Sequence, residues 1–146
     1  MVPGAAPASI NVVTLAPGRY RRSDWVETPA GDSITFGLTV FQIRFPEAWI
    51  TVDAGSNRDL MPSSRTFSNA VYATIQDALR DARLSVVTHE HWDHVRGVLR
   101  SSHLSEVQRH TMLTRAQVQT LLVAAPDARV TMDSTTAARY LIIDND

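Results

Sequence analysis

The feature that most constrains this chain is the segment from residue 88 to residue 98, which reads Thr-His-Glu-His-Trp-Asp-His-Val-Arg-Gly-Val. Three of the five histidines in the chain and one aspartate fall within six positions, as His89, His91, Asp93 and His94. The preceding residues, 84–87, are apolar and partly β-branched, which predicts a buried strand. We therefore expect the four polar side chains to leave the end of a strand together and to enter a loop.

The spacing of these side chains indicates two adjacent metal positions. In an extended or irregular segment, side chains two residues apart point the same way, so His89 and His91 can place two imidazole nitrogens on one ion. Asp93 and His94 follow and can face a second ion. Zinc suits imidazole and carboxylate ligands, and iron or manganese suit them nearly as well. Two zinc ions that share a water would lower its pKa and polarise a carbonyl or phosphoryl oxygen of a substrate, which is hydrolytic chemistry.

Other polar residues receive simpler interpretations. The side chain of Glu90 should point away from both neighbouring histidines, so we interpret it as a solvent or loop contact. His103 and His110 are isolated in the sequence, and single histidines are usually surface residues or hydrogen-bonded core residues. Asp53 ends an apolar segment at Asp-Ala-Gly, which is typical of a turn.

Apolar spacing along the chain predicts strands that alternate with helices. Strands are expected at residues 10–16, 34–44, 48–52, 84–87 and 140–143. Helices are expected at residues 67–82 and 114–125, with a short helix or turn within 102–109. Pro17-Gly18 predicts a turn after the first strand, residues 19–32 read as a loop, and Thr114 with Gln117 matches a capping box.

Composition excludes several functional classes. The 146 residues form one domain, 1–146, and the formal charge of -1 offers no basic field to nucleic acid. Because the chain has no cysteine, disulfides, thiolate ligands and cysteine nucleophiles are excluded. All 14 basic residues are arginine, which excludes a lysine nucleophile. No segment resembles a signal peptide or approaches the roughly 20 apolar residues that cross a bilayer, so we expect a cytoplasmic protein without a membrane partner.

The H-x-H-x-D-H run resembles the signature of the metallo-β-lactamase superfamily, whose members are mostly zinc-dependent hydrolases. The strand that ends at Asp53-Ala-Gly55 and the helix that follows are similar to the elements that precede this signature in the family. The resemblance implies that His89 and His91 bind one zinc ion and that Asp93 and His94 bind the second. It also implies a catalytic role for Asp93, which would hold the nucleophilic water, and a supporting role for Asp53, which would orient the ligands. The implied fold is α/β, the N-terminal half of an αββα sandwich, with a mixed sheet and helices on one face.

The chain departs from the family pattern in two places. The family motif commonly closes with two glycines, whereas this chain has Val95-Arg96-Gly97. We expect Arg96 to face solvent, and contact with a substrate anion is the alternative. The third histidine, the bridging aspartate and the last histidine of the family site have no counterpart in the sequence up to Asp146. We therefore expect an incomplete domain, either a fragment of a longer hydrolase or a short protein that pairs with a completing partner chain.

The resemblance implies a metal-dependent hydrolase that uses a zinc-bound hydroxide on an ester, thioester, lactone or related bond of a small-molecule substrate. The alternative is a non-catalytic metal-binding or interaction module, because four ligands spread over two ions leave each ion undersupplied. No nucleic-acid partner is expected.

Overall fold

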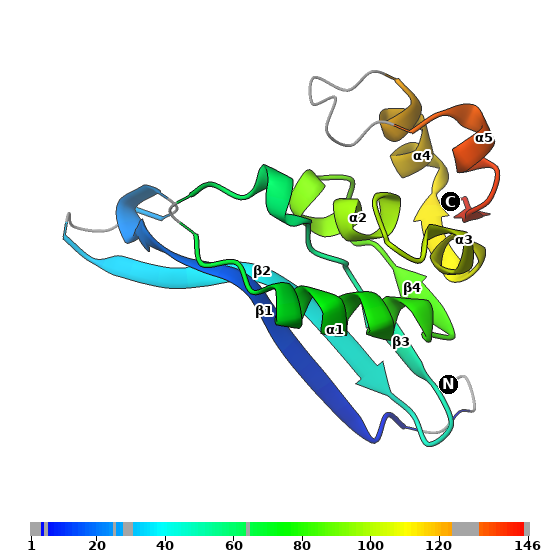
Figure 1. Ribbon diagram of the computed structural model, residues 1–146, viewed down its shortest axis with the longest axis horizontal. Helices are drawn as coiled ribbons and strands as arrows, with labels where there is room; N and C mark the ends of the chain where they lie inside the picture. Colours follow the sequence, from blue (N-terminus) through cyan, green and yellow to red (C-terminus); the bar gives the residue numbers. More distant parts are fainter. Residues whose placement is uncertain are drawn as a thin grey trace.

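The computed structural model describes residues 4, 6–24, 26, 27, 31–63, 65–123 and 132–144, and it contains a six-stranded sheet in the order β1-β2-β3-β4-β5-β6 (Figure 1). The strands are β1 (Ser9–Arg21), β2 (Ser33–Arg44), β3 (Trp49–Val52), β4 (Leu84–Val86), β5 (Thr111–Thr114) and β6 (Leu141–Ile143). Strand β2 pairs antiparallel with β1 and with β3, whereas β3 to β6 run parallel, so the sheet is mixed as expected.

Helices connect the parallel strands. They are α1 (Asn69–Arg80), α2 (Trp92–Leu99), α3 (Leu104–Val107), α4 (Arg115–Leu122) and α5 (Ser134–Ala137), with 3-10 turns η1 (Arg22–Asp24), η2 (Arg58–Leu60) and η3 (Gln108–His110). Ser68 caps α1 by accepting a hydrogen bond from the backbone N–H of Val71. The predicted capping box of α4 is present between Thr114 and Gln117. Within the described ranges, no helix is long and apolar enough to cross a membrane.

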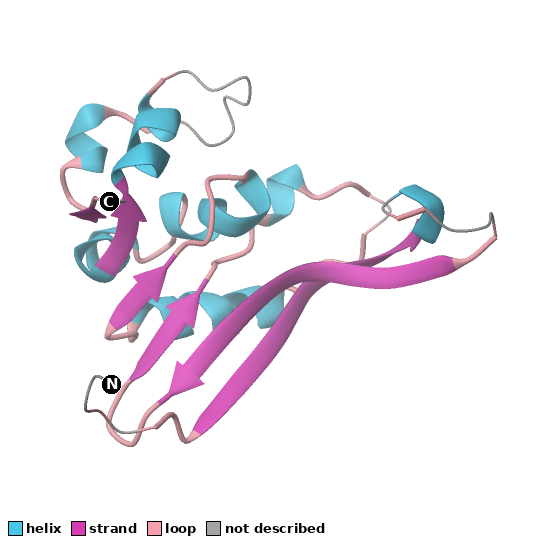
Figure 2. Ribbon diagram, turned by 180° about the vertical axis from the view of Figure 1, so that it is seen from behind, coloured by secondary structure: helices cyan, strands magenta, loops and turns pink. Residues whose placement is uncertain are grey.

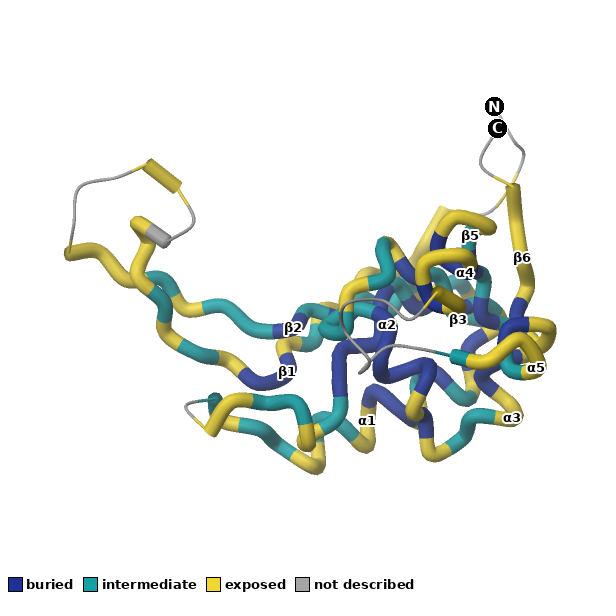
Figure 3. Tube along the Cα trace, turned by 90° about the horizontal axis from the view of Figure 1, so that it is seen from above, coloured by how far each residue is buried: buried dark blue, intermediate teal, exposed yellow. Residues whose placement is uncertain are grey.

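The hydrophobic core lies between one face of the sheet and the helices. Alternation along the strands turns residues such as Leu15, Val40 and Leu113 toward the helices, and all three are buried. Ile75 and Leu79 of α1 complete this part of the core. Figure 3 shows the buried segments gathered where the helices meet the sheet, while the far end of the β1–β2 hairpin is exposed. Each fully buried aliphatic side chain contributes about 1.5–3 kcal/mol, so this layer holds the strand ends in place.

The opposite face of the sheet is apolar and uncovered by any helix of the described residues (Figure 2). The strand register aligns two rows across this face: Ile10, Ile43, Ile50 and Leu84 form one, and Val12, Phe41, Val52, Val86, Met112 and Leu141 form the other. Ile10 is 59% exposed and Val12 is 58% exposed. We call these two rows the open face, and they contain no charged residue.

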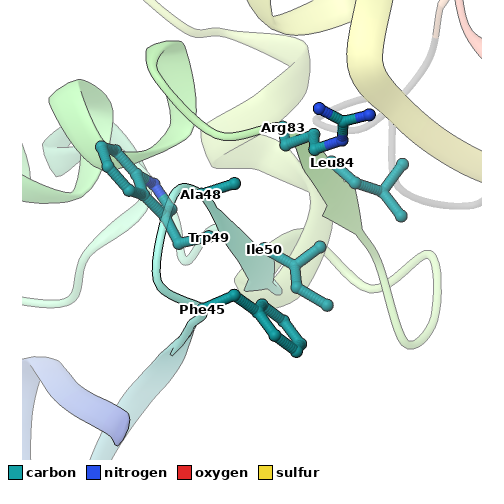
Figure 4. Close-up of a pocket in the computed structure, with 6 residues that line it drawn as sticks. All are labelled: Phe45, Ala48, Trp49, Ile50, Arg83 and Leu84. Carbon is teal, nitrogen blue, oxygen red and sulfur yellow. The ribbon is translucent and has the colours of Figure 1, made fainter. Parts of the chain in front are cut away.

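A pocket of about 370 Å³ lies at the edge of the open face, where β3 and β4 begin. Figure 4 shows the side chains of Phe45, Ile50 and Leu84 pointing to the same side there. The pocket is lined almost entirely by carbon atoms and lies at the opposite ends of β3 and β4 from the histidine run. It therefore belongs to the open face and not to the candidate metal centre.

The structure corrects two predictions and adds one strand. Pro17-Gly18 does not end the first strand, because β1 runs on to Arg21 through an irregularity between Leu15 and Gly18, where Ala16 has φ 51°. The polar run enters the predicted loop only as far as His91, because α2 begins at Trp92 and includes Asp93 and His94. Strand β5 was not predicted, since only two of its four residues are apolar. The other predicted strands and helices are confirmed as elements, although residues 25 and 28–30 of the predicted loop and residues 124 and 125 of the predicted helix lie outside the described residues.

Candidate metal centre

The candidate residues lie at the carboxyl ends of two adjacent parallel strands. Asp53 follows β3, and residues 87–91 follow β4 and lead into α2. The backbone N–H of Asp53 donates to the carbonyl of Val86 at 2.8 Å, which joins the two strand ends. Loops at this edge of an open α/β sheet are the usual position of a ligand site. Parallel pairing of β3 and β4 thus brings Asp53 to the histidine run from 35 or more positions away.

Asp53 is buried and accepts hydrogen bonds from two residues. Its side chain receives the backbone N–H of Thr88 at 2.8 Å, the hydroxyl of Thr88 at 2.9 Å and Nδ1 of His94 at 2.8 Å. Burial by itself would raise the pKa of Asp53, but the bonds from His94 and Thr88 outweigh it and the pKa lies below its usual range. The carboxylate is therefore ionised near neutral pH. Asp53 also has φ 63°, a left-handed conformation that aspartate tolerates better than most residues.

The bond to Asp53 fixes which nitrogen of His94 can bind a metal. Donation from Nδ1 leaves the lone pair of Nε2 free, which is the usual way in which a carboxylate orients a histidine ligand. Nε2 lies 3.7 Å from Oδ2 of Asp93. Hydrogen bonding to Asp53 also raises the pKa of His94 above its usual value, so a metal ion must displace a proton that is held more firmly than in free histidine.

The other two histidines of the run pack beside His94. The ring centroid of His89 lies 3.9 Å from that of His94 and 4.6 Å from that of His91. Burial lowers the pKa of His89, and the neighbouring rings of His94 and His91 lower it further, which favours the neutral, ligating form. The run therefore concentrates three imidazoles and the Asp93 carboxylate at one strand end, a donor set that fits zinc in type and number of nitrogens.

The side chains are gathered but not arranged as a finished site. Among the described residues, no group of three or more histidine, aspartate or glutamate side chains has the geometry that holds a metal ion. The rings of His89 and His94 are tilted by 46° to each other.

Backbone contacts fix α2, which carries Asp93 and His94, to the turn after β3. The N–H of Ala54 donates to the carbonyl of His94 at 2.9 Å, and the N–H of Gly97 donates to the carbonyl of Gly55 at 2.9 Å. A Cβ at position 97 would lie 2.0 Å from the carbonyl oxygen of Ala54, so only glycine fits. Gly97 is thus the point at which the backbone of α2 contacts the backbone of the turn after β3.

The expectation that Arg96 faces solvent is wrong. Its side chain is 9% exposed, Nε donates to Oδ1 of Asn57 at 2.6 Å, and Nη2 pairs with Asp59 at 2.7 Å. The guanidinium thus joins α2 to η2 and the residues before it. Sequence reasoning could not find these partners, which lie 37 and 39 positions away.

The two isolated histidines and Glu90 lie apart from the proposed ligands or carry no assigned role. His103 and His110 lie outside the cluster, with His110 Nε2 at 2.8 Å from the carbonyl of Leu79 and His103 Nε2 at 3.9 Å from Asp77. Glu90 is partly exposed.

Sequence analysis missed Thr88, whose hydroxyl lies 3.1 Å from Nδ1 of His89 and also contacts Asp53. The position of Thr88, directly between a buried strand and the histidine run, could have indicated that its hydroxyl contacts the candidate ligands.

Comparison with solved structures identifies the fold. A quorum-quenching N-acyl homoserine lactone hydrolase aligns with a TM-score of 0.62 and 10% identity over 97% of this chain and 59% of its own. A probable metal-dependent hydrolase from Staphylococcus aureus aligns with a TM-score of 0.61 and 12% identity over 94% of this chain and 59% of its own. The chain has the metallo-β-lactamase fold.

A third similar structure is an N-acyl homoserine lactone hydrolase with its product, N-hexanoyl-L-homoserine, bound at the catalytic metal centre. It aligns with a TM-score of 0.60 and 10% identity over 97% of this chain and 61% of its own. No protein-family model and no curated protein matches the chain. The chain spans about three fifths of the length of the solved structures that it matches, and identities of this size establish the fold alone.

Proposed function

We propose that this chain provides the metal centre of a metal-dependent hydrolase, with His89, His91, Asp93 and His94 as ligands. The observation that carries the proposal is the bond from Nδ1 of His94 to buried Asp53, which leaves Nε2 of His94 free beside Asp93 and the His89 ring. The hydrogen bonds that Asp53 accepts offset the cost of burying its charge, and the bond from His94 also fixes the orientation of that ring. The similar solved structures of hydrolases support the same reading.

The side chains have separate roles in the proposed reaction. Zinc bound here would supply a water activated at neutral pH and an electrophile for the substrate carbonyl. Asp53 keeps Nδ1 of His94 protonated and Nε2 available. Asp93, in the first turn of α2, would accept a hydrogen bond from the attacking water and then receive its proton.

The proposed substrate is a small molecule with an ester, thioester, lactone or related bond. The lactone is the form to test first, because lactone hydrolases are among the similar solved structures. Zinc is the proposed metal, and iron or manganese would suit the same nitrogen and oxygen donors.

We further propose that a second layer of polypeptide, from the same protein or from a partner chain, covers the open face and completes the site. Ten apolar residues in two rows across six strands would be covered by such a layer. Four ligands shared by two ions give two each, whereas zinc in catalytic sites takes about three protein ligands. The missing ligands would come from the covering layer.

Zinc binding and hydrolysis in matched variants test the proposal. We expect this chain to bind zinc in competition with a colorimetric chelator, and we expect the protein completed by the covering layer to hydrolyse γ-butyrolactone or 4-nitrophenyl acetate when zinc is present. His91→Ala should weaken zinc binding at least about tenfold and abolish turnover. His103→Ala removes a histidine outside the cluster and should change neither.

Two other results of these zinc-binding and hydrolysis assays would change the proposal. Zinc binding that depends on His91, without turnover of any ester, thioester or lactone, would favour the non-catalytic metal-binding module. Equal zinc affinity in the parent and the His91→Ala variant would refute the metal centre itself.

A further inference from the structure

The hydroxyl of Thr88 lies between the carboxylate of Asp53 and the ring of His89. Its oxygen is 2.9 and 3.0 Å from the two carboxylate oxygens of Asp53 and 3.1 Å from Nδ1 of His89. A longer contact of 3.4 Å joins the same hydroxyl to Nδ1 of His94. The backbone N–H of Thr88 also donates to Asp53, at 2.8 Å, so the backbone of this residue is held independently of its hydroxyl.

The directions of these hydrogen bonds follow from the chemistry of the partners. A hydroxyl has one proton to donate and lone pairs that accept, whereas an ionised carboxylate only accepts. Two oxygens 2.9 Å apart need a proton between them, and of the two groups only the hydroxyl of Thr88 can supply it. With its proton committed to Asp53, this hydroxyl can only accept a bond from His89. Nδ1 of His89 must therefore carry the hydrogen.

The contacts of Thr88 favour a role in orienting the rings over a purely structural one. Threonine hydroxyls near the ends of strands often bond to backbone groups close by in the chain. Within the described residues, the hydroxyl of Thr88 instead makes its polar contacts to side chains of the candidate metal centre, those of Asp53, His89 and His94. Thr88 is also exposed, so its side chain adds little to the hydrophobic core.

We propose that Thr88 is a positioning residue that holds His89 in the tautomer whose Nε2 is free to bind a metal. In a neutral imidazole, a hydrogen on Nδ1 leaves the metal-binding lone pair on Nε2. The carboxylate of Asp53 thus sets the tautomers of two histidines, that of His94 directly and that of His89 through the hydroxyl of Thr88. That zinc takes Nε2 of His89 rests on the proposed function, whereas the tautomer itself does not.

NMR of the histidine ring nitrogens in the zinc-free protein tests this directly, because the two tautomers give different patterns of couplings between ring nitrogens and ring hydrogens. At about pH 8, above the usual histidine pKa of about 6.5, we expect His89 of the parent to be in the Nδ1–H form. Its signals are assigned by their loss in His89→Gln. Thr88→Val removes the hydroxyl and keeps the side-chain shape, so His89 should shift toward the Nε2–H form that histidine favours in water. Thr88→Ser keeps the hydroxyl and should keep the parent tautomer.

Zinc affinity provides a second measurement on the same variants. Loss of a group that orients a metal ligand lowers affinity about 10–100-fold, and we expect about tenfold for Thr88→Val because water can replace part of the bond at this exposed residue. Thr88→Ser should bind zinc as the parent does. Thr120→Val is the matched control, since Thr120 is likewise exposed and its hydroxyl donates to the carbonyl of Ala116 at 3.1 Å in α4. This control should change neither the tautomer of His89 nor the zinc affinity.

An Nε2–H form of His89 in the parent would overturn the proposal, and so would an unchanged tautomer in folded Thr88→Val. Weaker zinc binding in Thr88→Val without a change of tautomer would show that Thr88 only shapes the loop. If Thr88→Val fails to fold, the spectrum of the parent and that of Thr88→Ala, which also lacks the hydroxyl, decide the question. Failure of the parent to bind zinc would remove the proposed metal centre, while the ring spectra of the zinc-free protein would still decide the role of Thr88.

Discussion

The substitution Gly97→Ala would force α2 away from the turn that follows β3. The added Cβ would lie 2.0 Å from the carbonyl oxygen of Ala54, 2.7 Å from its carbonyl carbon and 2.9 Å from its Cβ. Both sides of this contact are close to the backbone, so no side chain can rotate away. To bring the shortest contact to 3.0 Å, α2 and the turn after β3 must separate by about 1 Å.

The energetic cost follows from the contacts at this junction. Separation weakens two backbone hydrogen bonds, from Ala54 to His94 and from Gly97 to Gly55, each contributing about 0.5–1.5 kcal/mol. Overpacking adds about 1–3 kcal/mol, and the better helix propensity of alanine returns about 1 kcal/mol. We therefore expect the free energy of unfolding to fall by about 3 kcal/mol. With a urea slope of about 1–3 kcal/mol per M, the unfolding midpoint should drop by about 1–3 M.

Urea unfolding followed by circular dichroism measures this change. Gly4→Ala is the control, because a Cβ at that position meets nothing within 4 Å. The same separation would displace Asp93 and His94, so zinc affinity should fall along with stability. If Gly97→Ala unfolded at the urea concentration of the parent, the close approach of α2 to the turn would not exist as described.

Two further substitutions probe residues that support the site. Asp53→Asn removes the charge that holds Nδ1 of His94, so we expect zinc affinity to fall about 10–100-fold with little change in secondary structure. A zinc competition assay measures this, and unchanged affinity would contradict the orienting role of Asp53. Arg96→Met removes the guanidinium that donates to both Asn57 and Asp59. Thermal unfolding should show that the free energy of unfolding falls by about 1–2 kcal/mol, a modest loss because Asp59 is exposed to solvent. A variant as stable as the parent would show that this ion pair contributes nothing measurable.

Local sequence signals predicted much of the fold and the composition of the candidate site. The strands at 34–44 and 48–52 and the capping box at Thr114 depend on neighbours in the sequence, and they are present in the structure. The histidine run also needed no distant contact to be noticed.

Features that depend on distant contacts were missed or misread. Strand β5 is a strand because it pairs with β4 and β6, and its own residues favour that state weakly. Pro17-Gly18 has the composition of a turn, but pairing of β1 with β2 on both sides carries the chain through it as an irregularity. Helix α2 had a readable signal in Val95, Val98 and Leu99, spaced three and four apart, which the polar run before it obscured.

The position at which α2 begins divides the proposed ligands into two groups. His89 and His91 precede Trp92, whereas Asp93 and His94 lie in the first helical turn. The positive end of the helix repels cations, and the carboxylate of Asp93 offsets this repulsion. The ligands proposed for the second ion therefore require an intact helix start, and those proposed for the first do not. Two metal ions should accordingly load in a fixed order, the first on the segment before the helix, and warming that frays the first turn should release the second ion before the protein unfolds.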